Sequence, residues 1–88
     1  MISIHEVFLR DEIKSADSIT DPERMNLNAY LLDHYGMAFK DIHSDSFDFA
    51  LKKALIRSKK SIDIPIQIIK TVKNDSDYFR DSVIFREI

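Results

Sequence analysis

The side chains that could support catalysis or metal binding are few and scattered along this chain of 88 residues. Its three histidines, His5, His34 and His43, stand far apart, and none has a second ligand at the spacing of a metal site. Asp75 and Asp77 begin like a calcium loop, but the glycine and the glutamate that such a loop needs do not follow. With no cysteine and a single glycine, the chain also lacks a thiol nucleophile and a glycine-rich phosphate loop. We therefore expect a protein without enzymatic activity, bound metal or cofactor.

One serine lies in a short motif that resembles a known attachment site. The letters DSFD at 45–48 are followed by IDIP at 62–65 and IKTV at 69–72. This series resembles the region around the modified serine of acyl carrier proteins, although the helix that follows is acidic in that family and basic here. The resemblance implies an all-α four-helix bundle in which Ser46 carries phosphopantetheine. An Asp-Ser pair is also a common start of an ordinary helix. An acyl-carrier-like protein modified on Ser46 is therefore one alternative interpretation.

The segment after this serine has the pattern of an amphipathic helix with a basic face. Placed at helical spacing, six residues fall on one face in a pattern typical of a core stripe: Phe47, Ala50, Leu51, Ala54, Leu55 and Ser58. The opposite face carries five cations and two large apolar residues, Phe49 and Ile56. Solubility alone does not require such a mixture, so we predict that this face binds a partner. The predicted partner-binding residues are Phe49, Lys52, Lys53, Ile56, Arg57 and Lys60.

The charges on this face favour an acidic protein as the partner, with the two apolar residues as anchors. DNA is an alternative partner, because the third helix of a winged-helix protein enters the major groove. Asp45 and Asp48 at the start of the helix and a calculated pI near 5.8 argue against this alternative. Another part of the chain could also cover Phe49 and Ile56, which would leave an ordinary solvated face.

Capping residues predict three helices. Ser3 and Glu6 have the spacing of a capping box and predict a first helix from about Ile4 to Ser15. Asp21 followed by Pro22 predicts the start of a second helix, which Gly36 should end. The third helix, with the basic face, should begin at Ser44 or Asp45 and reach about Lys60.

The remainder of the chain has the pattern of β-structure. Isoleucines at 62, 64, 66 and 68 alternate with polar residues or Pro65, which favours an edge strand over 61–72. The segment 78–88 reads as a returning strand because of Val83, Ile84 and Phe85, or as a last helix capped by Ser76. The prediction is an α+β fold of three helices followed by a C-terminal β-hairpin, as in winged-helix proteins.

Composition places the chain among single globular domains, here residues 1–88. It has no apolar run long enough for a membrane span, and the absence of cysteine fits a reducing compartment, so we expect a cytoplasmic protein. Residues 1–48 carry a net charge of −6 and residues 49–88 one of +4. This asymmetry allows self-association into a homodimer as an alternative. Together these observations predict a small regulatory binding protein, of a type that includes phage and immunity proteins.

Overall fold

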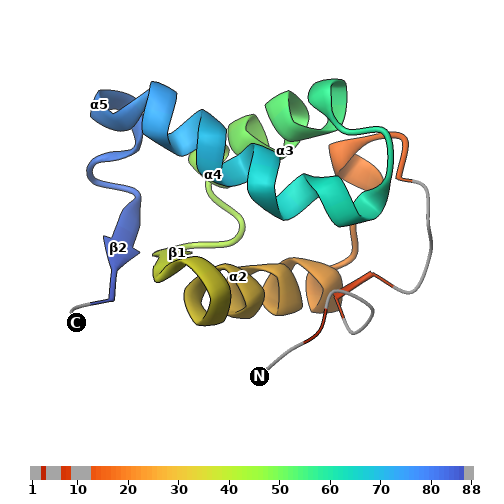
Figure 1. Ribbon diagram of the computed structural model, residues 1–88, viewed down its shortest axis with the longest axis horizontal. Coiled ribbons are helices and arrows are strands. Elements are labelled where there is room, and N and C mark those ends of the chain that lie inside the picture. Colours follow the sequence, from red (N-terminus) through yellow and green to blue (C-terminus); the bar gives the residue numbers. More distant parts are fainter. Residues whose placement is uncertain (1–2, 4–6, 9–12, 87–88) are drawn as a thin grey trace.

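The computed structural model describes residues 3, 7–8 and 13–86, and Figure 1 shows its arrangement. Helices α3 and α4 pack against each other, and α2 lies along the opposite side of the core, next to a small sheet. The elements in chain order are the 3-10 turn η1 (Ala16–Ser18), α2 (Asp21–Tyr35), β1 (Met37–Phe39), α3 (Asp45–Arg57), the 3-10 turn η2 (Ser61–Asp63), α4 (Ile64–Asn74), α5 (Ser76–Phe79) and β2 (Val83–Phe85).

Helix α2 has defined signals at both ends. Thr20, rather than the predicted Asp21, is the N-cap: its hydroxyl accepts a hydrogen bond from the Glu23 amide, and the Glu23 carboxylate accepts one from the Thr20 amide. This reciprocal pair satisfies two amides that an uncapped helix leaves without partners. At the other end Gly36 has φ 69°, the left-handed conformation that stops a helix. The predicted helix 22–35 and its stop at Gly36 are confirmed.

The core lies where α3 and α4 face α2 and the sheet. From α3 it receives four residues of the predicted stripe, Phe47, Ala50, Leu51 and Ala54, whereas Leu55 and Ser58 are half-buried. The ring of Phe47 makes an edge contact with Phe39 of β1, with 4.9 Å between ring centroids. Helix α3 begins after Ser44, whose hydroxyl accepts a hydrogen bond from the Phe47 amide, and it ends at Arg57, three residues before its predicted end. The fully buried side chains of these elements include Leu27, Leu31, Phe47, Leu51, Ile64, Ile68 and Phe79.

Strands β1 and β2 form a two-stranded antiparallel sheet in which Ala38 faces Ile84. The outer edge of β1 is covered by a side chain of α2 instead of a third strand. The Asn28 amide group donates a hydrogen bond to the Phe39 carbonyl at 3.0 Å and accepts one from the Phe39 amide at 2.7 Å. A single side chain thus replaces the pairing that a neighbouring strand would give, and it ties the sheet to α2.

The strand predicted over 61–72 is wrong, because Ile64–Asn74 form helix α4. The isoleucines that alternate along a strand also fit a helix: Ile64 and Ile68 lie one turn apart and are buried, whereas Ile62 and Ile66 are exposed. Pro65 lies in the first turn of α4, where its missing N–H is harmless, so it starts a helix and does not mark an edge strand.

The α+β fold class is confirmed, but the sheet differs from the predicted hairpin. The C-terminal strand exists at Val83–Phe85, preceded by the short helix α5, and its partner is Met37–Phe39 in the middle of the chain. The sheet also distinguishes this fold from the all-α four-helix bundle that the acyl-carrier resemblance implies. The first predicted helix falls mostly outside the described residues, and its end at 13–15 is not helical.

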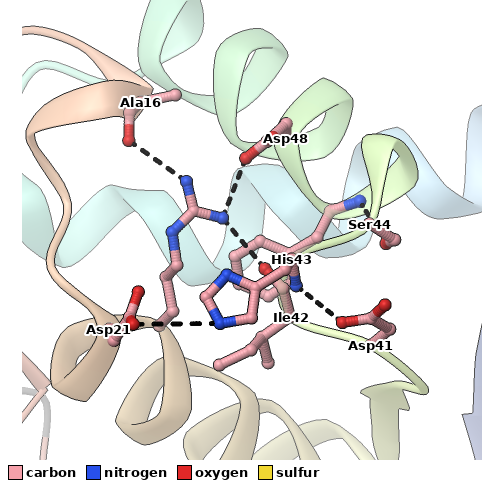
Figure 2. A network of polar contacts seen from close by, with 9 residues as sticks. Ala16, Asp21, Asp41, Ile42, His43, Ser44 and Asp48 are labelled. Atoms are coloured by element: carbon pink, nitrogen blue, oxygen red, sulfur yellow. Dashed lines mark hydrogen bonds and ion pairs between the residues drawn. The ribbon is translucent and has the colours of Figure 1, made fainter.

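A buried arginine joins four segments of the chain (Figure 2). The guanidinium of Arg24, in α2, lies 2.8 Å from Asp48 of α3 and donates a hydrogen bond to the Ile42 carbonyl at 2.9 Å. It also reaches the Ala16 carbonyl of η1 at 3.5 Å and lies 5.5 Å from the centre of the Phe47 ring. Asp48 Oδ1 is buried and has no hydrogen-bond partner besides this ion pair, whereas the side chain as a whole is 38% exposed.

Replacing Arg24 by methionine should destabilise the fold, because it leaves the Asp48 carboxylate and two carbonyls without their partner. We expect a loss of about 2–3 kcal/mol in the free energy of unfolding, measured with urea, since the Asp48 side chain is partly hydrated. The double variant Arg24→Met/Asp48→Asn should lose less than the sum of the single changes. Arg57→Met, at an exposed position of α3, is the control and should change stability by about 0.5 kcal/mol or less. Equal losses for Arg24→Met and Arg57→Met would contradict the role of the network.

Gly36→Ala should cost about 1–2 kcal/mol of unfolding free energy, because a residue with a side chain rarely adopts a positive φ. The added Cβ would meet only the Arg86 Cβ at 3.9 Å, an ordinary contact, so the cost is conformational. Gly36→Asn should lose less, because asparagine tolerates this conformation. If Gly36→Ala and Gly36→Asn lose the same large amount of unfolding free energy, the cost is steric and does not come from the backbone conformation.

Candidate functional site

The C-terminal half of α3 and the turn after it form an exposed basic surface. Its apolar centre is Ile56, whose residue surface is 79% exposed. We call the following group the α3 surface: Lys52, Ile56, Arg57, Lys59 and Lys60, all of which are exposed. Four of the six residues predicted from sequence are therefore on one accessible part of the molecule.

The other two predicted residues, Phe49 and Lys53, are half-buried and contact the chain itself. The centroid of the Phe49 ring lies 4.9 Å from that of Tyr78 and 5.9 Å from that of Phe79, and both of these residues are in α5. The Lys53 ammonium stands over the Phe49 ring, 5.6 Å from its centre. This cluster joins α3 to α5. Of the two apolar residues predicted on the basic face, Phe49 is therefore partly covered and Ile56 remains exposed.

The cations of the α3 surface form no ion pair with any acidic side chain that the structure describes. Between described residues the ion pairs are Arg24 with Asp48 and the exposed contact of His43 with Asp21 at 3.9 Å. The α3 surface borders a shallow hollow of about 450 Å³ between α3 and residues 14–17, with Lys52, Leu55 and Ile56 on its α3 side. An exposed isoleucine beside a hollow, among cations without an ion pair to a described residue, is the arrangement expected of a contact surface.

Ser46, the serine of the acyl-carrier resemblance, is in the first turn of α3 and is half-buried. Its hydroxyl lies 2.7 Å from the Ser82 hydroxyl, and the two form a hydrogen bond. This bond joins the start of α3 to the residue before β2. The structure therefore gives Ser46 a role in holding the C-terminal segment against α3.

The described histidines do not form a metal centre. His34 stacks on Tyr30 with 4.0 Å between ring centroids, and His43 lies near Asp21 at the other end of α2. In the described part of the chain no three histidine or acidic side chains come together as metal ligands. His5 lies outside the described residues.

None of the described helices is both long and apolar enough to span a membrane.

Sequence reasoning missed an apolar cavity at the opposite side of the fold from η1. It lies between the end of α2, the two strands, α4 and α5, and contains none of the residues predicted as a site. The signal was weak, because the cavity depends on the pairing of β2 with β1, and no local pattern of residues indicates that pairing.

Comparison with known proteins finds no matching family model, no similar curated protein and no similar solved structure.

We expect Ser46 to remain unmodified when the protein is incubated with coenzyme A and a phosphopantetheinyl transferase. Attachment would require the Ser46 hydroxyl to leave its hydrogen bond with Ser82. Intact-mass measurement decides this, with an authentic acyl carrier protein as the positive control. A gain of one phosphopantetheine that disappears in Ser46→Ala would establish the acyl-carrier interpretation instead.

Proposed function

We propose that this protein is a small non-enzymatic regulatory module that binds an acidic protein partner through the α3 surface. The observation that carries the proposal is the exposure of Ile56 among cations that have no described acidic partner. In this mechanism Ile56 is the apolar anchor, and Lys52, Arg57, Lys59 and Lys60 attract and orient the partner.

The distribution of charge supports an acidic partner. Helix α3 carries its acids, Asp45 and Asp48, in the first turn and Arg57 in the last turn. Asp48 is paired with Arg24, so the negative end of the helix is partly neutralised within the fold, whereas the positive end faces solvent. A negatively charged segment that meets this end gains attraction at long range, which raises its rate of association.

A protein is favoured over nucleic acid for two reasons. Asp45, at the start of α3, is exposed and would repel phosphate from the end of the helix that reads bases in winged-helix proteins. The segment that would have formed the wing is helix α4. Ile56 adds an apolar contact of the kind that protein interfaces use as an anchor.

The test compares matched variants in capture of partners from the native source, followed by affinity measurement with the purified partner. Ile56→Ala should weaken binding about ten- to a hundredfold, because about 1.5–3 kcal/mol of apolar burial is lost. Arg57→Glu should also weaken binding relative to the wild type, and the size of this loss should increase as ionic strength falls. Met25→Ala and Lys70→Glu, at exposed positions of α2 and α4, are the controls and should bind like the wild type. The unfolding free energy of all four variants should stay within about 0.5 kcal/mol of the wild type.

Two outcomes would overturn this function. Binding that is insensitive to Ile56→Ala and Arg57→Glu would place the contact elsewhere. Tight association with duplex DNA, falling steeply as salt rises and lost in Arg57→Glu, would replace the protein partner by nucleic acid.

A further inference from the structure

The apolar cavity has the size and shape of a small-molecule site. Its volume is about 430 Å³, and it is partly open to solvent between α4, α5 and the sheet. Sites for small ligands are usually concave and apolar, with a few polar groups at defined places. The cavity shares no residue with the α3 surface, so an occupant here is independent of the function proposed above.

The wall of the cavity is hydrocarbon, and its entrance carries two aromatic rings. Tyr35 and Phe85 stand at this entrance with 41% and 68% of their surfaces exposed. Phe85 is on β2 and faces Met37 of β1 in the register of the sheet. The buried side chains that complete the wall are Met37, Ile69, Val72, Phe79 and Val83. Such a wall offers dispersion contacts to an alkyl chain and few hydrogen bonds to a polar ligand.

The polar groups of the cavity favour a negative charge. Lys73 of α4 and Arg80, just after α5, line it together with one acidic residue, Asp77, and all three are exposed. The lining thus contains two cations and one carboxylate, and neither cation has an ion pair with a described residue. Burial, aided by the neighbouring Tyr30, raises the pKa of the Tyr35 hydroxyl.

We propose that this cavity binds an aliphatic carboxylate, with the alkyl chain against Ile69, Val72 and Val83 and the carboxylate near Lys73 and Arg80. Charge complementarity selects the head group, because an arginine can hold a carboxylate through two hydrogen bonds. The hydrocarbon wall selects the tail. A nucleotide or sugar would leave many of its polar groups without partners in this wall.

The proposal is tested by titrating the ¹⁵N-labelled protein with straight-chain saturated carboxylates of increasing length, kept below the concentration at which they form micelles. Amide shifts should appear in α4, α5 and β2, with one molecule bound per chain. Affinity should rise about fourfold for each added methylene until the cavity is full, as expected for burial of one CH₂ group. The alcohol and the alkylammonium of equal chain length should bind more weakly than the carboxylate.

Two pairs of variants separate the wall from the charges. Phe85→Ala should weaken carboxylate binding about tenfold, whereas Ile84→Ala, at an exposed neighbour that does not line the cavity, should leave it unchanged. Lys73→Gln should weaken binding of the carboxylate and not of the alcohol. Lys70→Gln, at an exposed position of the same helix away from the cavity, is its control. Circular dichroism and urea unfolding verify that each variant is folded.

Several results would overturn the proposal. These are absence of shifts with every monomeric carboxylate, equal affinity for the alkylammonium, or equal losses in Phe85→Ala and Ile84→Ala. Binding only to anionic phospholipid vesicles would make the occupant a membrane surface. A dimer in sedimentation experiments that Phe85→Ala dissociates would make it a second copy of the chain.

Discussion

The ion pair between Arg24 and Asp48 is the contact on which the arrangement of the helices depends. Arg24 meets α3, η1 and the loop before α3 from its position in α2, so one guanidinium fixes the mutual positions of four segments. A buried arginine is costly to desolvate, and it persists here because its partners are supplied from all of these segments. It also holds the first turn of α3, which directs the basic end of that helix toward solvent.

Two different surfaces follow from this arrangement. Holding the first turn of α3 fixes that end of the helix in the fold, and the cations at its other end remain exposed on the α3 surface. Returning β2 to β1 encloses an apolar cavity that α3 does not border. The first surface suits a large charged partner and the second a small apolar one, so the two sites would act independently unless α5 couples them. Helix α5 contacts α3 through Phe49, which lies outside the α3 surface, and it lines the cavity on its other side.

Local signals in the sequence predicted the start and end of α2 and the start of α3, because caps act within one turn of the chain. They could not decide the isoleucines at 62–68, which fit either period until a partner surface is known. Strand β1 was hidden because its three residues become a strand only through β2 and the side chain of Asn28. For the candidate site, the cations and Ile56 were readable from spacing. The burial of Phe49 was not, because Tyr78 and Phe79 approach it from far along the chain.

The pairing of β1 with β2 also has a consequence for the order of folding. Helices α3 and α4 are neighbours in sequence and pack against each other, so the loop that must close between them is short. The sheet joins the middle of the chain to its last residues and closes a much longer loop. The helical pair can therefore form first, and the sheet completes the molecule only when nearly the whole chain is present. A chain that ended before Val83 would keep most of its helices. It would lose β2, and with it the side of the cavity that Val83 and Phe85 form.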